Sequence, residues 1–147
     1  MENLPHLHKL PRDENDWFAA LIALARYLRS PEGCPWDRKQ RAADFARYAA
    51  EETQEFIEAC AKHDNGHMAE EFGDSFFTLL AAAAAAEEEG LFRLEDALRG
   101  IHEKMVRRHG HVFGADRAAT AEDAVEIWKR VKVQEKAHQQ TREQADE

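Results

Sequence analysis

The feature that most constrains the fold is an uninterrupted run of six alanines at positions 81–86, which follows Leu79 and Leu80. Alanine has the highest intrinsic helix propensity, and its small side chain lets neighbouring helices approach closely. It occurs 26 times in 147 residues, nearly as often as Val, Ile, Leu and Phe combined, which number 28. So few β-branched residues argue against an all-β fold. The chain is therefore expected to form a closely packed helical bundle.

Charge and cysteine usage exclude several classes of protein. The formal net charge is −9, and this acid excess argues against binding along a nucleic-acid backbone. The longest apolar stretch, residues 76–86, is too short to span a bilayer. Cys34 and Cys60 make no disulfide framework, and the N-terminal residues lack the pattern of a secretory signal. We therefore expect a cytoplasmic protein with neither nucleic acid nor membrane as a partner.

Helix-breaking residues divide the chain at regular intervals. The apolar spacing predicts helices over about 17–28, 38–62, 67–89 and 95–109, and a fifth helix that opens with the capping-box pair Thr120 and Asp123. The expected organisation is an irregular arm at 1–14, a helical domain at 15–138 and a flexible polar tail at 139–147. The fold class is an antiparallel bundle of about five helices, completed by dimerisation.

Two pairs of acidic residues lie where apolar side chains are expected. Glu52 lies between Ala49 and Phe56 in the apolar stripe of its helix, and Glu55 follows one turn later. Glu71 and Asp74 have the same spacing on the next helix, and the tight turn at 63–66 predicts that the two helices pack antiparallel. These four carboxylates, with Glu51, should meet across one helix–helix seam. Glu87 to Glu89, in contrast, are expected to form a solvated helix end.

Such a cluster is stable only if its charge is offset. Buried carboxylates cannot all stay ionised beside one another, and hard divalent cations such as Mg²⁺, or Mn²⁺ in its place, resolve this conflict. In the alternative interpretation the acids face solvent and pair with Arg38, Arg47 or Lys62. A cationic face on the fourth helix, Lys104, Arg107 and Arg108, either complements the helix dipole or holds a polyphosphate.

A set of short motifs also occurs in order along residues 17–136. They are Cys34-Pro35-Trp36-Asp37 with Gln40 behind it, Tyr48 before Glu51-Glu52-x-x-Glu55, Glu70-Glu71-x-x-Asp74, Gly90-Leu91-Phe92, Lys104-x-x-Arg107-Arg108-His109-x-His111-Val112-Phe113-Gly114, and Trp128 with Lys132 to Lys136. In this order and spacing the chain resembles the MazG family of nucleoside triphosphate pyrophosphohydrolases. It departs from the family pattern at residues 40–45 and at Gly110, where many relatives have proline.

The resemblance implies an all-α fold, a homodimer or homotetramer, and Mg²⁺-dependent cleavage of a nucleoside triphosphate between its α- and β-phosphates. The products would be a nucleoside monophosphate and pyrophosphate, with the carboxylate–metal cluster activating water. The resemblance implies Glu52, Glu55, Glu71 and Asp74 as metal ligands and Glu51 as the base that orients water. The substrate-binding residues it suggests are Trp36, Lys104, Arg107, Arg108, His111, Trp128 and Lys132.

Two other interpretations compete with this one. The first is a helical interaction or regulatory module of the same fold, with weakened catalysis and solvated acids. The second is a di-iron carboxylate bundle, which requires Glu-x-x-His on two helices. Such a pair occurs only at Glu135 and His138, close to the expected tail, so the di-iron interpretation is disfavoured.

Overall fold

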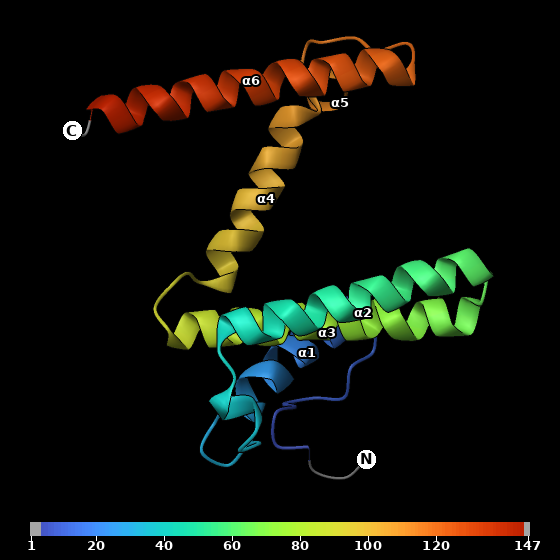
Figure 1. Cartoon of the computed structure of the whole chain (residues 1–147), viewed down its shortest axis with the longest axis vertical. Coiled ribbons are helices and arrows are strands. Elements are labelled where there is room, and N and C mark those ends of the chain that lie inside the picture. The colour runs from blue at the N-terminus through green and yellow to red at the C-terminus, as the bar shows by residue number, and fades with distance from the viewer. Residues whose placement is uncertain (1–3, 146–147) are drawn as a thin grey trace. The chain divides into compact units, whose positions relative to one another are not determined.

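The computed structural model describes residues 4–145, with side chains through Ala137, and within that range every regular element is helical (Figure 1). The elements are α1 (Glu14–Leu28), η1 (Asp37–Lys39), α2 (Ala42–Lys62), α3 (Asn65–Glu88), α4 (Leu94–Arg108), α5 (Gly110–Phe113) and α6 (Ala121–Ala145). This confirms the all-helical fold expected from the alanine content. No helix in the described range is both long and apolar enough to cross a membrane.

The chain divides into two compact units, Met1–Leu94 and Glu95–Glu147. The sequence predicted a single helical domain over residues 15–138. In the first unit α2 and α3 form an antiparallel pair (Figure 1), and α1 packs against α3. The alanine run lies at the centre of this unit, and Ala85 and Ala86 are completely buried. Helices that meet through such small side chains can build a dense core with few large aliphatic residues.

Residues of the alanine run belong to two clusters of the hydrophobic core. Ala84 packs with Ala25 and Leu80, while Ala81 and Ala85 pack with Phe45. Aromatic residues extend the first cluster, with the rings of Phe18 of α1 and Phe76 of α3 5.8 Å apart between their centroids. One helix thus buries alanine against both α1 and α2, which fixes α3 as the central helix of the unit.

The second helix begins four residues later than the sequence indicates. Residues 37–39 form the separate 3-10 helix η1, and Gln40 adopts an extended conformation before α2 starts at Ala42. The Asp44 carboxylate accepts a 2.9 Å hydrogen bond from the Arg41 backbone N–H, which caps the new helix. Arg29 stabilises the break, because its guanidinium donates to the carbonyl oxygens of Asp37 (2.6 Å) and Gln40 (3.0 Å).

The prediction that Glu87 to Glu89 form a solvated helix end is wrong. Glu87 accepts two 3.0 Å hydrogen bonds from Arg26 of α1, and Glu88 accepts a 2.6 Å bond from the buried Arg29. Glu89 accepts from the backbone N–H of Ala42 (2.7 Å) and from Arg41 (3.0 Å). These three glutamates therefore tie the end of α3 to α1, to the loop after α1 and to the start of α2.

The second unit contains most of α4, the short α5 and α6. The predicted capping box at the start of α6 is present, because the Asp123 N–H donates to Thr120 Oγ1 (3.2 Å) and the Thr120 N–H donates to Asp123 Oδ2 (3.1 Å). Helix α6 continues to Ala145, through most of the segment 139–147 expected to be a flexible tail. Residues 146 and 147 of that expected tail lie outside the described range.

Candidate metal centre

The turn between α2 and α3 sets the register of the site. His63 adopts a left-handed conformation (φ 55°) that ends α2, and the carboxylate of Asp64 caps α3 by accepting from the His67 N–H at 3.2 Å. Along the resulting hairpin, the ring centroids of Phe56 and Phe72 lie 6.0 Å apart. The turn is thus present but shorter than the predicted 63–66, because α3 already starts at Asn65, and it brings the two acidic motifs alongside each other.

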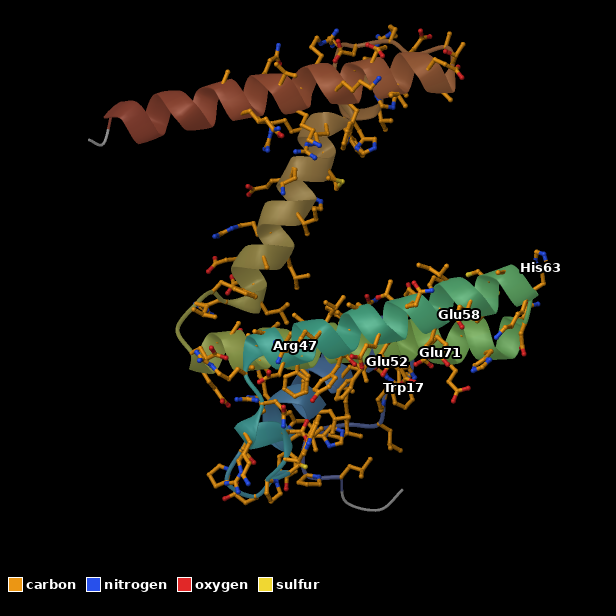
Figure 2. The ribbon with its side chains drawn as sticks, in the orientation of Figure 1. Trp17, Arg47, Glu52, Glu58, His63 and Glu71 are labelled. Atoms are coloured by element: carbon orange, nitrogen blue, oxygen red, sulfur yellow. The ribbon has the colours of Figure 1, made fainter. Side chains whose placement is uncertain are left out.

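Three of the predicted metal ligands meet across this hairpin. Glu52 and Glu55 of α2 and Glu71 of α3 each offer a carboxylate oxygen, and these oxygens lie within 4.8 Å of one another. Figure 2 shows the labelled Glu52 and Glu71 side by side on the two helices. Glu71 is only 5% exposed, although most carboxylates lie on protein surfaces. The sequence therefore located a cluster of acids at a partly buried seam.

The charges of the other two predicted acids also reach this cluster. Burial is the largest cause that raises the pKa of Glu52 above its ordinary value, and the negative charges of Asp74, Glu55, Glu71 and Glu51 raise it further. Asp74 and Glu51 are therefore close enough to repel the Glu52 carboxylate, although their oxygens do not join the group within 4.8 Å. The cluster favours an added positive charge.

The cations proposed as alternative partners differ in where they lie, because Arg47 and Lys62 line a groove beside Glu51 and Glu55 and Arg38 does not. Arg47 pairs with Asp44 on its own helix, and Arg38 donates to the carbonyl oxygen of Pro31 at 3.4 Å. Lys62 lines an open groove of about 790 Å³ that Glu51, Glu55 and His67 also line. A set of carboxylate oxygens around an accessible groove suits a hard divalent cation, which also keeps positions for water or phosphate oxygens.

One residue of the site was missed by the sequence analysis. His67 Nε2 lies 3.0 Å from Glu71 Oε1, and His67, Glu70 and Glu71 form a second group whose ligand atoms lie within 4.8 Å of one another. The sequence does hold a signal for this contact, because His67 precedes Glu71 by four residues on one helix face. The acidic motifs alone did not draw attention to it.

Among the predicted substrate-binding residues, Trp36 lies in the first unit and all the others lie in the second. Arg107 and Arg108 of α4 both pair with Glu135 of α6, at 2.6 and 2.7 Å. The pKa of Glu135 lies below its ordinary value, chiefly because Arg108 donates a hydrogen bond to its carboxylate and also because Arg107 does. Lys104 is partly exposed on the same helix. An anion that binds Arg107 and Arg108 would compete with a carboxylate of the chain itself.

Trp128 lies beside two cations, Arg108 and Lys132. The Arg108 guanidinium is 5.2 Å and the Lys132 ammonium 4.8 Å from the Trp128 ring centroid, both within the range of cation–π attraction. A pocket of about 230 Å³ is lined by Trp128 together with His109 and His111. The Nδ1 atom of His111 is buried, with no hydrogen-bond partner within the described residues. This unit therefore offers an aromatic surface next to cations and an unsatisfied polar atom.

Trp36 belongs to the first unit and packs with other aromatic residues. Its ring centroid lies 6.1 Å from that of Phe45 and 5.7 Å from that of Tyr48, and 52% of Trp36 remains exposed. The side chain thus packs in the bundle while keeping an open face, and its role in substrate binding stays a prediction.

Comparison with known proteins finds relatives of this chain. The MazG nucleotide pyrophosphohydrolase domain matches residues 40–113, which include both acidic motifs. The chain is 39% identical over 119 residues, 81% of its length, to the nucleoside triphosphate pyrophosphohydrolase/pyrophosphatase MazG of Thermotoga maritima. It is 41% identical over 119 residues, again 81% of its length, to YabN of Bacillus subtilis, an uncharacterized protein.

These relatives are longer proteins, of which the chain spans 45% and 24% respectively. A solved structure, that of a mazG-related protein from Thermotoga maritima, is 33% identical and superimposes with a TM-score of 0.65. That alignment covers 76% of this chain and 95% of the other. With the domain match over half of its length and this shared helical fold, the chain belongs to the MazG nucleotide pyrophosphohydrolase family.

Proposed function

We propose that the protein is a nucleoside triphosphate pyrophosphohydrolase that requires a divalent cation, Mg²⁺ or Mn²⁺. The reaction is hydrolysis between the α- and β-phosphates, which gives a nucleoside monophosphate and pyrophosphate. The observation that carries the proposal is the meeting of Glu52, Glu55 and Glu71 across the α2–α3 seam. Membership of the MazG family supports the reaction type.

The carboxylates have separate roles in this proposal. Glu52, Glu55, Glu71 and Asp74 would hold the cation, and the raised pKa of Glu52 is consistent with a cluster that takes up positive charge. When bound, a divalent cation polarises phosphate oxygens and makes water a better nucleophile. Glu51, which is exposed beside the groove, would orient the attacking water and accept its proton. The water oxygen then bonds to the α-phosphorus as the bond to the pyrophosphate oxygen breaks.

The residues of the second unit complete the proposal for substrate binding. We assign Lys104, Arg107, Arg108 and Lys132 to polyphosphate, and His111 to a phosphate contact. Trp128 is assigned to the base, because an aromatic ring presents a flat apolar face for stacking. The exposed face of Trp36, which belongs to the first unit, is proposed separately as a stacking surface. The contact of Arg108 and Lys132 with Trp128 supports placing base and phosphate groups near one another within this unit.

Self-association remains a prediction. On the first unit Ile57, Phe72 and Leu79 are each more than half exposed, although they are large and apolar. Exposed apolar residues of this kind support the expected homodimer or homotetramer, in which a second copy would cover them.

The proposal is tested with a panel of nucleoside triphosphates and Mg²⁺, scoring pyrophosphate separately from orthophosphate. We expect pyrophosphate and the monophosphate in equal amounts. Orthophosphate as the direct product would overturn cleavage between the α- and β-phosphates. Release of neither product from any nucleotide would favour the helical interaction module instead.

A binding measurement separates that module from the enzyme without relying on turnover. We expect a saturating divalent cation, at about 100 times its Kd, to stabilise the folded chain by about 2.7 kcal/mol. Glu71→Gln should lose most of this stabilisation, because the buried carboxylate is one of the proposed ligands. An interaction module with solvated acids predicts the same unfolding temperature with Mg²⁺ and with EDTA.

A further inference from the structure

The first two turns of α3 hold two side chains that the proposed reaction does not use, His67 and Glu70, beside Glu71, which it does use. His67, Glu70 and Glu71 are spaced i, i+3 and i+4, and one ligand atom of each lies within 4.8 Å of the others. Two of these side chains, His67 and Glu70, are exposed, and Glu71 is buried. The group shares Glu71 with the cluster of Glu52 and Glu55, so the two sets of ligands adjoin each other.

We propose that His67, Glu70 and Glu71 form a second cation position, which takes Mn²⁺ in preference to Mg²⁺. The inference rests on the proposed function, because Glu71 would serve both positions. A carboxylate has two oxygens, and two-metal sites commonly hold their ions about 3.5–4 Å apart. His67 is then a ligand and not simply a neighbour of the proposed metal centre.

The spacing of the donors fits an ion. Two adjacent ligands of an octahedral cation, each at about 2.1 Å, lie about 3.0 Å apart. His67 Nε2 and Glu71 Oε1 are separated by 3.0 Å, so they already have the spacing of such a pair.

Charge also favours a second ion. Glu70 adds a further carboxylate to the five that gather around the seam, Glu51, Glu52, Glu55, Glu71 and Asp74. A single divalent cation offsets two of these negative charges, and two cations offset four. Arg47, which pairs with Asp44, and Lys62 also line the groove beside Glu51 and Glu55, so the cations that line the groove are fewer than the carboxylates that gather there.

The imidazole influences which cation binds. Mg²⁺ takes oxygen ligands, whereas affinity for a site with a nitrogen donor begins to rise with Mn²⁺ and increases along the first-row metals, so Mn²⁺ accepts His67 more readily than Mg²⁺ does. The cluster of Glu52, Glu55 and Glu71 consists of oxygen donors alone and suits Mg²⁺. The position that contains His67 should therefore distinguish Mn²⁺ from Mg²⁺.

The experiment titrates the full chain with Mn²⁺, measuring stoichiometry by calorimetry and ¹⁴N coupling to the bound ion by pulsed electron paramagnetic resonance. We expect two Mn²⁺ ions per chain and a coupling from one directly bound imidazole nitrogen. In His67→Gln, the side-chain amide can still donate to Glu71 but offers no imidazole nitrogen. This variant should lose the coupling and weaken the second Mn²⁺ by at least about tenfold.

The matched control is His63→Asn, which removes the imidazole at the end of the same hairpin (Figure 2) and keeps a residue that tolerates the left-handed conformation. It should retain both ions and the coupling. Equal Mn²⁺ stoichiometry and coupling in wild type and His67→Gln would overturn the inference, as would the absence of nitrogen coupling in wild type. Failure of the proposed function looks different, because the nucleotide panel would then be negative while both Mn²⁺ ions still bind.

Discussion

Two groups of acidic residues along α3, one of them shared with α2, show how the same kind of side chain serves different ends. Near the end of the helix, Glu87 and Glu88 each accept hydrogen bonds from an arginine, Arg26 and Arg29 respectively. Four turns earlier, Glu71 faces the carboxylates of Glu52 and Glu55, and His67 Nε2 lies 3.0 Å from its Oε1 atom. Arginines of the chain pair with the first group, Glu87 to Glu89, which we call the satisfied group. The second group concentrates negative charge at a partly buried seam, and we call it the unsatisfied group; it comprises Glu52, Glu55, Glu71 and Asp74.

The difference is visible in the direction of the pKa shifts. Hydrogen bonds from Arg26 lower the pKa of Glu87, and the backbone N–H of Ala42 followed by Arg41 lowers that of Glu89. Burial and neighbouring carboxylates raise the pKa of Glu52. All of these residues are glutamates, so residue type does not explain the difference. The surroundings of each carboxylate decide whether its pKa is lowered by hydrogen-bond donors or raised in a way that favours a bound cation.

The largest expected effect comes from the charge of the unsatisfied group. Glu52→Gln and Asp74→Asn keep the shape of the side chains but remove a proposed ligand, and we expect each to lower kcat/KM for nucleotide hydrolysis by more than about 100-fold. Because each variant also relieves repulsion, its unfolding temperature in EDTA should equal or exceed that of wild type.

Glu58→Gln is the control for these variants, since Glu58 is an exposed glutamate on the same helix as Glu52 (Figure 2) and accepts a 3.3 Å hydrogen bond from Gln54. It should retain activity. Unfolding of Glu52→Gln and Asp74→Asn in EDTA would mean that these acids are structural, and the contrast between the two groups would be lost.

The next largest effect should come from the satisfied group. Arg29 is 8% exposed and donates to the Glu88 carboxylate and to two backbone carbonyls, those of Asp37 and Gln40. In Arg29→Ala the buried carbonyls lose their donor, and we expect a loss of about 3 kcal/mol in the free energy of unfolding. Urea denaturation measures this loss, and the exposed Arg38→Ala serves as control. A change below about 0.5 kcal/mol would show that the Arg29 contacts do not hold the loop.

The sequence predicted the unsatisfied group better than the satisfied one. Glu52 stands out because it interrupts an apolar stripe between Ala49 and Phe56, a pattern that is local to one helix. The partners of Glu87 and Glu88 lie 61 and 59 residues away along the chain, so no local spacing could reveal them. The helices themselves were predictable, because alanine propensity and turn residues act locally.

Other features depended on tertiary contacts. The break before α2 exists because Arg29 reaches the carbonyl oxygens of residues 37 and 40, and no pattern around residue 40 indicates this. The pairing of Arg107 and Arg108 with Glu135 likewise joins residues 28 and 27 positions apart. Sequence spacing identified the cationic face but not the carboxylate that contacts it.

The smallest effect is the pH dependence of stability, and its sign differs between the two groups. The folded pKa of Glu87 is lowered, so its contribution is present above the ordinary glutamate pKa of about 4.5 and is lost as pH falls through the folded value. The folded pKa of Glu52 is raised, so the metal-free protein loses stability as pH rises through that value and regains it on acidification. In urea denaturation with EDTA, Glu87→Gln should therefore reduce the loss of stability below about pH 4.5, whereas Glu52→Gln should abolish a gain that accompanies acidification from neutral pH toward about pH 4.5. Identical pH profiles for the two variants would contradict the contrast, because Arg26 lowers the pKa of Glu87 whereas burial and neighbouring carboxylates raise that of Glu52.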